Sequence, residues 1–202
     1  YVPGKHPPDV VGTPDFIAPE CVMTSHLSRD DPNRRLPPIT TDRHALAILV
    51  YMYLLYRHPL RGSKVHDPDD EQRDEALAMG ANALFIEHPT NKANRLRLDR
   101  NAPDYERAWL DTDRLPHTIT GPYLSALFQR AFIDGLHDPA QRPTAEEWEM
   151  ALVKTIDLIQ PCQNKACEQK WYVFDNSRAP RCPFCGTPFH GKLPVLNLYS
   201  AS

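Results

Sequence analysis

The sequence predicts a mainly helical protein with a small, cysteine-rich β appendage at its C-terminal end. Three observations predict it: a long uncharged stretch, two later segments with helix-start signals, and four cysteines gathered after residue 160. A chain of 202 residues that is 41% hydrophobic has room for one domain of ordinary size and an appendage. We place the boundary near Gln160, with a helical domain over 1–160 and the appendage over 161–202.

The stretch from Ala45 to Tyr56 contains no charged residue. A helix that is apolar on all sides has no solvent face, so we expect this one to be buried as the centre of the domain. About 18 Å of helix is too short to cross the ~30 Å core of a bilayer. Thr40 or Thr41 is expected to cap the helix, and His58-Pro59 to end it.

Helices are also predicted on both sides of a turn near residues 134–143. Gly121-Pro122 suits a first helical turn, and apolar residues then recur at spacings of three and four. Thr144 and Glu147 have the spacing of a capping box. The apolar face of this last helix is expected to comprise Trp148, Leu152, Ile156 and Ile159. A weaker pattern predicts a helix over Asp74–Phe85.

Composition excludes some classes of function. The net charge of −3 and the isoelectric point near 6.3 provide no overall basic field that would attract nucleic acid or an anionic membrane. No apolar stretch approaches the ~18 residues of a membrane span, and no signal peptide opens the chain, so we expect a cytoplasmic protein. The chain begins with Tyr1 rather than Met, which suggests a piece of a longer protein.

The four clustered cysteines predict a zinc site. Cys162 and Cys167 form one close pair, and Cys182 and Cys185 form the other. Two thiolate pairs brought together by a hairpin suit a closed, tetrahedral, structural zinc ion, which has no open position for catalysis. A redox C-x-x-C motif and buried cysteines without a ligand are the alternatives. Cys21 is interpreted as a small buried side chain rather than a nucleophile.

Three further motifs occur in a fixed order. Gly12–Glu20 ends in Ala-Pro-Glu, Asp42–Leu55 combines an aspartate with a long apolar run, and Asp138–Thr144 contains an arginine before a helix start. In this order they resemble the C-terminal lobe of a protein kinase: the end of its activation segment, its central helix, and the turn before its last helix. The resemblance covers roughly Gly12 to Gln160 and implies a helical bundle around a buried central helix.

Four shorter motifs give a closer likeness: Val11–Pro14, His58-Pro59, Glu87–Pro89 and Asn94-Arg95. With the cysteine-rich tail, they look like bacterial kinases found beside a phosphatase and a von Willebrand A-type protein in tellurite-resistance-type gene neighbourhoods. The resemblance therefore implies a protein substrate, and that phosphatase or von Willebrand A-type protein as further partners. It implies no membrane partner.

The resemblance implies a role for each matching residue. Glu20 and Arg142 would form the ion pair that fastens the activation segment to the lobe. Asp42 would accept hydrogen bonds from the backbone of the catalytic loop. Thr13 would sit beside the catalytic aspartate and help seat the substrate hydroxyl. Gly12–Phe16 would shape the pocket for the residue after the phosphoacceptor.

The departures from the kinase pattern are as informative as the matches. The chain has no G-x-G-x-x-G, no V-A-I-K lysine, no H-R-D-x-x-x-x-N and no D-F-G, since Asp15-Phe16 is followed by Ile17 and then directly by Ala-Pro-Glu. Phosphoryl transfer needs those parts to cover the phosphates, hold the metal and orient the hydroxyl. We therefore expect ATP and Mg²⁺ to bind only through a missing N-terminal part. The parent is expected to be a serine/threonine-like kinase and this fragment alone to be inactive.

Two other functions compete with this interpretation. The lobe could belong to an inactive pseudokinase scaffold whose zinc ribbon binds a protein or a nucleic acid. The chain could also be a nucleic-acid protein centred on the ribbon, although the net negative charge and the isolated Arg178, Arg181 and Lys192 argue against it. The long segment Arg61–Pro116 is interpreted as an insertion of unassigned role.

Overall fold

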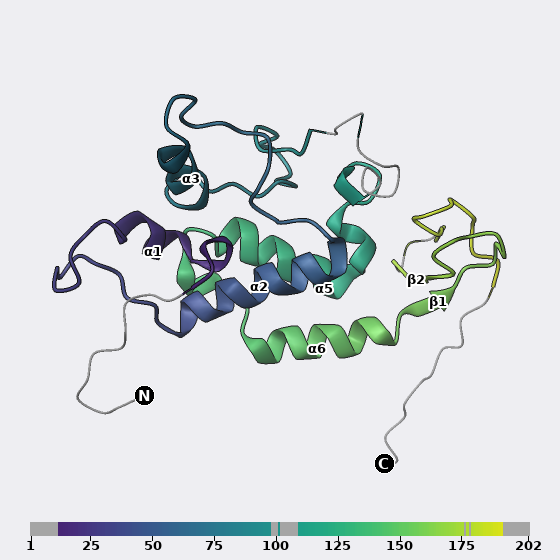
Figure 1. The fold of residues 1–202 in the computed structure, drawn as a ribbon. Coiled ribbons are helices and arrows are strands. Elements are labelled where there is room, and N and C mark those ends of the chain that lie inside the picture. Colours follow the sequence, from purple (N-terminus) through teal and green to yellow (C-terminus); the bar gives the residue numbers. More distant parts are fainter. Residues whose placement is uncertain (1–11, 98–100, 102–108, 176, 178, 192–202) are drawn as a thin grey trace, which may run out of the picture.

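The computed structural model describes residues 12–97, 101, 109–175, 177 and 179–191, and this part of the chain is mainly helical with one small sheet (Figure 1). The ends of both expected domains, 1–11 and 192–202, lie outside the described residues. No described helix is long and apolar enough to cross a membrane. The α-helices are α1 (Pro19–Thr24), α2 (Ile39–Leu55), α3 (Glu71–Met79), α5 (Pro122–Gln129) and α6 (Ala145–Ile156), and the strands are β1 (Ile159–Pro161) and β2 (Trp171–Val173).

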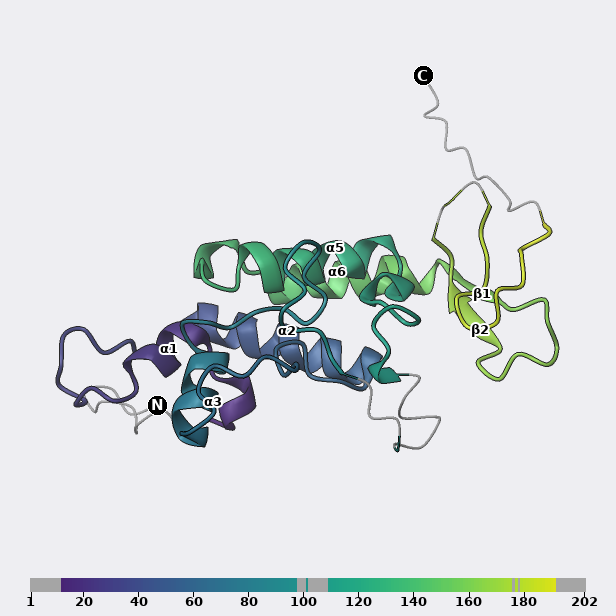
Figure 2. The same ribbon diagram turned by 90° about the horizontal axis from the view of Figure 1, so that it is seen from above.

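The molecule is elongated, with α1 and α3 at one end and the sheet at the other (Figures 1 and 2). Helix α2 runs along the middle, and α5 and α6 pack together on one side of it. Short 3₁₀ turns at Pro14–Phe16, His117–Thr120 and Pro139–Gln141 connect the helices. A π-helical turn over Arg130–Asp134 extends α5. The predicted combination of a helical body and a small β element is confirmed.

Helix α2 is central, but the expectation that it is buried on all sides is wrong. Thr41, His44, Ile48, Tyr51 and Leu55 form the buried face, since they recur at spacings of three and four. The opposite face is open: Leu49 is 43% exposed, Tyr53 75% and Tyr56 71%. Among the described residues, Trp109 contacts the Tyr56 ring, with centroids 5.0 Å apart, while Leu49 and Tyr53 remain exposed.

Both ends of α2 also differ from expectation. Pro38 is the N-cap residue, without a side-chain cap, and the Thr41 hydroxyl instead donates to the Pro38 carbonyl at 2.7 Å. Tyr56 takes a left-handed conformation, with φ of 55°, and ends the helix before His58-Pro59.

The core forms where α2 meets α5 and α6. The Tyr51 ring contacts Phe85, Phe128 and Phe132 edge-on, at centroid distances between 5.1 and 5.8 Å. Trp148 from α6 packs against Phe128, with ring centroids 5.2 Å apart. These aromatic contacts add specific geometry to the burial of large apolar surfaces.

The predicted helix starts are confirmed at α5 and α6. Pro122 occupies the first turn of α5, and Thr144 with Glu147 forms a complete capping box. The predicted face of α6 is only partly right, because Ile156 is 64% exposed and Ala151 and Thr155 are buried beside Trp148 instead. Helix α3 begins before the expected residue, because the Asp70 side chain accepts from the Arg73 amide, and it ends before Gly80.

The sheet consists of β1 and β2 in antiparallel register, with Ile159 opposite Val173 and Pro161 opposite Trp171. The expected boundary residue Gln160 therefore lies inside β1, where it pairs with Tyr172. The sheet packs closely on the helical body. Gly121 has a φ of 87°, and a Cβ there would lie 2.4 Å from a Val173 methyl carbon, so only glycine fits.

Candidate functional site

The four clustered cysteines come together as the sequence predicts. All four sulfur atoms lie within 4.8 Å of one another, although the pair Cys162 and Cys167 is well separated in sequence from the pair Cys182 and Cys185. The sulfurs of Cys162 and Cys185 are 3.5 Å apart, and those of Cys167 and Cys182 are 3.9 Å apart. Four thiolates around a tetrahedral zinc ion at 2.3 Å would be about 3.8 Å apart, so the cluster is compatible with that ion.

The local backbone explains how each cysteine pair is presented. Gly186 has a φ of 73°, and its amide donates to the Cys182 carbonyl at 2.9 Å, which closes a tight turn around Cys185. Burial raises the pKa of the Cys182 thiol, and the backbone amides of Phe184 and Cys185 that point at its sulfur offset this only in part. The hydroxyl and the amide of Thr187 contact the Cys185 sulfur and lower the pKa of that thiol to about 6. Amides directed at sulfur favour the thiolate, which is the form that binds metal.

The apolar core around the cysteines is very small. Its buried members are Tyr172 and Phe174 together with Cys167 and Cys182. Phe189 adds an edge-on ring contact to Phe174 at 5.4 Å. A unit with so little apolar burial needs a further source of stability, and a bound metal ion supplies one in domains of this size.

The guanidinium of Arg142 pairs with the carboxylate of Glu20, as the kinase resemblance implies. Nη1 donates to Oε1 at 2.8 Å and Nη2 to Oε2 at 2.7 Å, the two-point arrangement that suits arginine and carboxylate. The Arg142 side chain is 1% exposed and that of Glu20 is 23% exposed. The pair joins α1 to the turn before α6.

Arg142 also binds three backbone carbonyls. Nε donates to Gly135 at 2.8 Å, Nη1 to Thr40 at 2.9 Å and Nη2 to Leu136 at 3.2 Å. All five guanidinium N–H groups therefore have a partner. Because Thr40 lies in the first turn of α2, one side chain connects α1, α2 and the end of α5.

The two other expected site residues are on the surface. Thr13 is exposed and precedes the 3₁₀ turn Pro14–Phe16 without capping it through its side chain. Asp42 is exposed in the first turn of α2. Neither forms a hydrogen bond or ion pair with Glu20 or Arg142, and the expected roles of Thr13 and Asp42 stay predictions.

A groove of about 460 Å³ lies beside the Pro14–Phe16 turn. Its apolar lining includes Pro14 and Ile17 on one side and Met79 of α3 on the other. Cys21 also lines it; burial raises the pKa of this thiol to about 11, which agrees with the interpretation as a non-nucleophilic side chain.

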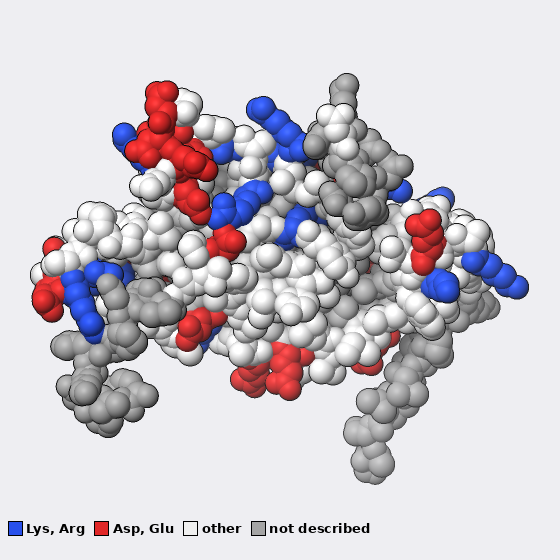
Figure 3. Space-filling view, viewed as in Figure 1, with Lys and Arg blue, Asp and Glu red and all other residues white. Residues whose placement is uncertain are grey.

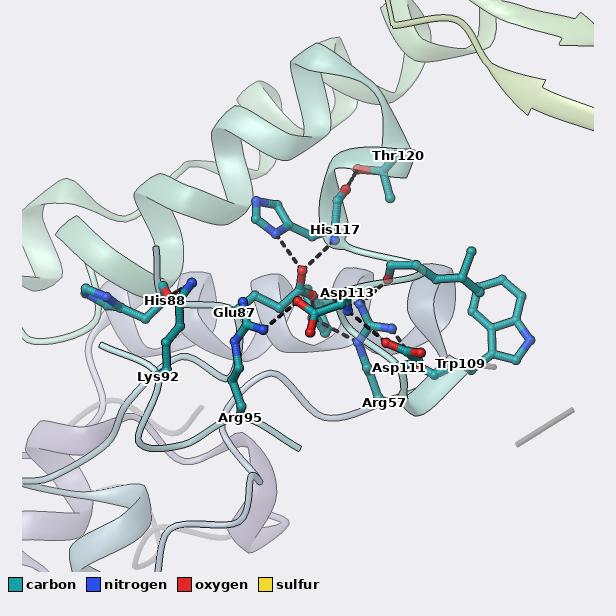
Figure 4. Close-up of polar contacts among 12 residues, drawn as sticks. Arg57, Glu87, His88, Lys92, Arg95, Trp109, Asp111, Asp113, His117 and Thr120 are labelled. Atoms are coloured by element: carbon teal, nitrogen blue, oxygen red, sulfur yellow. Dashed lines mark hydrogen bonds and ion pairs between the residues drawn. The ribbon is translucent and has the colours of Figure 1, made fainter. Parts of the chain in front are cut away.

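Sequence reasoning missed a second buried polar cluster, centred on Arg57 and Glu87 (Figure 4). Arg57 donates to Glu87 at 2.7 Å and to the Leu115 carbonyl at 2.7 Å. Glu87 also accepts from the Tyr51 hydroxyl and from the amide of His117, the latter at 2.7 Å. Glu87 belongs to a motif noted above, but nothing in the sequence pairs it with Arg57.

This cluster joins α2 to the segment that follows α3, and it leaves the buried His117 Nε2 without a hydrogen-bond partner among the described residues. Burial raises the pKa of Glu87, but the hydrogen bond from His117 and the charge of Arg57 outweigh it and lower that pKa to about 2. The His117 Nδ1 atom lies 3.0 Å from the same carboxylate and donates to it. Both carboxylate oxygens are therefore occupied, and the long segment between α3 and α5 is fastened to α2.

The face drawn in Figure 3 shows no extended field of one sign among the described residues. Acidic side chains gather at the start of α3, where Asp70, Glu71 and Asp74 lie, while basic side chains are scattered between them and the sheet (Figure 3). Such a surface offers no continuous track for a phosphate backbone on this face.

Comparison with protein families, with curated proteins and with solved structures found no match for this chain.

Proposed function

We propose that this chain is the substrate-side, C-terminal part of a serine/threonine-like protein kinase, followed by a zinc ribbon. The pairing of Glu20 with Arg142 carries the proposal. The kinase resemblance implies this contact between residues 122 positions apart, and the two side chains form it with two-point geometry. Chance would seldom place the two matching residues in contact across so long a separation.

The open face of α2 is a second support. Asp42, Leu49 and Tyr53 lie on this face, and the kinase resemblance implies that the backbone of the catalytic loop packs against Asp42 there. An aspartate next to exposed apolar side chains suits a surface that receives backbone amides and apolar groups. The missing catalytic part would therefore supply the cover that the described residues lack.

The groove beside Thr13 is the proposed place for the substrate. An extended peptide lying along it would place an apolar side chain against Pro14 and Ile17, while its hydroxyl would lie near Thr13. The described residues include none of the parts that cover phosphates or hold Mg²⁺, so ATP would bind through the missing part. This chain would therefore bind and orient the protein substrate, and the missing part would bind ATP.

The cysteine cluster is proposed as a zinc ribbon with a structural Zn²⁺ held by Cys162, Cys167, Cys182 and Cys185. The ion would stabilise the small sheet, and four thiolates leave no position for a reacting water. We infer that the ribbon acts as an appendage of the kinase rather than as a nucleic-acid module, because no continuous basic patch is visible around it among the described residues in Figure 3; Arg178 and Lys192 lie outside those residues.

The test is a phosphoryl-transfer assay with the polypeptide encoded by the complete reading frame. We expect transfer from ATP to protein hydroxyl groups, and a loss of at least about tenfold in Glu20→Gln and Arg142→Met, because a misplaced substrate platform lowers the rate. A complete reading frame without a glycine-rich loop, H-R-D or D-F-G would contradict the kinase proposal. Eroded versions of these motifs with no transfer would favour the pseudokinase scaffold.

A further inference from the structure

The turn that follows α2, from His58 to Arg61, is closed by hydrogen bonds to the side chain of His58. The Nδ1 atom of His58 accepts from the amides of Leu60, at 3.1 Å, and Arg61, at 3.2 Å. Because Nδ1 accepts two hydrogen bonds, the ring proton must be on Nε2. Nε2 lies 3.0 Å from the carbonyl oxygen of Asp15 and therefore donates to it.

Arg61 also binds Asp15, through the Arg61 side chain. Its Nε donates to the Asp15 carboxylate at 2.6 Å, and its Nη2 donates to Glu75 of α3, also at 2.6 Å. Asp15 is thus held at its backbone by one residue of the turn and at its carboxylate by another. Through Arg61 the contact continues to α3.

The turn itself is fixed from the other side by the segment that follows α3. Asn94 donates to the Leu60 carbonyl at 2.8 Å, and the Ile86 amide donates to the Pro59 carbonyl at 2.9 Å. Gly62 approaches so closely that a Cβ there would lie 1.8 Å from the Asn94 carbonyl oxygen. The base of the His58 turn is therefore rigid.

These contacts lie beside the groove: Glu75 lines it, whereas Asp15, His58 and Arg61 are not among its lining residues. Pro14 and Ile17, on both sides of Asp15, form one wall, and Glu75 and Met79 of α3 form the other. We propose that His58 and Arg61 are positioning residues that hold the Pro14–Ile17 wall at a set distance from α3 and thereby determine how the substrate segment fits. The effect on substrate fit rests on the proposed kinase function, whereas the role of His58 and Arg61 in holding the wall does not.

Hydrogen exchange of the full, zinc-loaded chain tests the mechanical role. Asparagine in His58→Asn can still accept the two turn amides, as in an Asx-turn, but is too short to reach the Asp15 carbonyl. We expect the amides of Phe16 and Ile17 to exchange about fivefold faster in His58→Asn, while those of Leu60 and Arg61 keep their protection.

The chain offers a matched control in His88. Its Nδ1 accepts from the amides of Thr90, at 3.3 Å, and Asn91, at 3.0 Å, so His88-Pro89 forms the same kind of turn away from the groove. His88→Asn should leave exchange at Phe16 unchanged. Unchanged exchange at Phe16 in His58→Asn, or a proton found on Nδ1 of His58 by long-range ¹⁵N NMR, would overturn the proposal.

A second readout concerns substrate binding in the complete polypeptide. His58→Asn should raise the KM for the protein substrate about fivefold and change kcat little, because the groove wall positions substrate and does not touch the phosphates. A fall in kcat at unchanged KM would overturn the positioning role. If the polypeptide transfers no phosphate at all, the kinase proposal fails, while the exchange experiment still decides whether His58 holds the wall.

Discussion

The helical body and the cysteine-bound sheet are stabilised in different ways. The body buries large aromatic side chains around Tyr51. It also accommodates two buried arginines, because Arg142 and Arg57 each form an ion pair with a carboxylate. The sheet buries little more than Tyr172 and Phe174 beside its cysteines. Paired charges thus organise a unit that already has a core, whereas in the sheet the proposed zinc ion would replace a core that is too small.

The largest expected effect is loss of the ribbon structure without any loss of the helical body. Cys182→Ser should abolish zinc binding and unfold the ribbon, while the helical body stays folded, because structural zinc contributes about 10–16 kcal/mol in small zinc peptides. Elemental analysis should find one zinc ion per wild-type chain and none in the variant, and NMR should show loss of the Tyr172 and Phe174 ring contacts. The control Cys21→Ser should keep its zinc; a wild-type chain without zinc would contradict the ribbon.

The next effect concerns the body alone. Arg142→Met leaves Glu20 without its partner and should lower the free energy of unfolding by about 3–5 kcal/mol. Arg130→Met removes a comparable ion pair to Glu147 that is roughly one third exposed, and should cost at most about 1 kcal/mol. Urea unfolding measures both values. Equal losses in the two variants would show that burial of the Arg142 pair adds nothing.

Acid should destabilise the body through Glu87. Its pKa is 4.5 ordinarily and about 2 in the folded chain, so as the pH falls the unfolded state takes up the proton first. The stabilisation is complete above pH 4.5 and is lost towards pH 2, by about 3 kcal/mol. His44, whose pKa burial lowers to about 3, adds a loss that begins below pH 6.5.

Glu87→Gln isolates the first of these contributions. Urea unfolding at several pH values should show the difference between wild type and variant shrinking between pH 4.5 and 2, while the His44 contribution remains in both. A constant difference over that range would mean that Glu87 is not held as a carboxylate by Arg57 and His117.

The smallest effect is a local one in the body. Thr144→Ala removes the capping box of α6 and should lower the free energy of unfolding by about 1 kcal/mol. The exposed Ser28, which caps none of the described helices, provides the control Ser28→Ala. Zinc content should be the same in both variants; a loss of zinc in Thr144→Ala would mean that the two regions are coupled through α6.

Local signals in the sequence were the most reliable. The capping box at Thr144 and the gathering of the four cysteines were predictable because each depends on residue type and spacing. The contact between Glu20 and Arg142 was predictable only through the resemblance, since no spacing rule links residues so far apart. Asp70 was overlooked as a cap because it lies within a run of acidic residues.

The remaining features depend on tertiary contacts that leave no pattern. Helix α2 has an open face, yet its exposed positions Leu49 and Tyr53 are as apolar as its buried ones, so the sequence reads as hydrophobic all round. The pairing of Arg57 with Glu87 joins two charged residues that look solvent-exposed in sequence. Such a pair can be recognised only in the folded structure, where the segments that carry the two residues lie side by side.

The open face of α2 permits the most direct test of the kinase proposal. Cysteine introduced as Tyr53→Cys should react readily with a maleimide in this chain, as read by mass spectrometry of the labelled peptide. In the polypeptide from the complete reading frame, we predict that labelling slows at least about tenfold because the catalytic part covers the face. Val153→Cys on α6, where Val153 is 53% exposed, should label equally in both. Equal labelling of Tyr53→Cys in both polypeptides would contradict the kinase proposal.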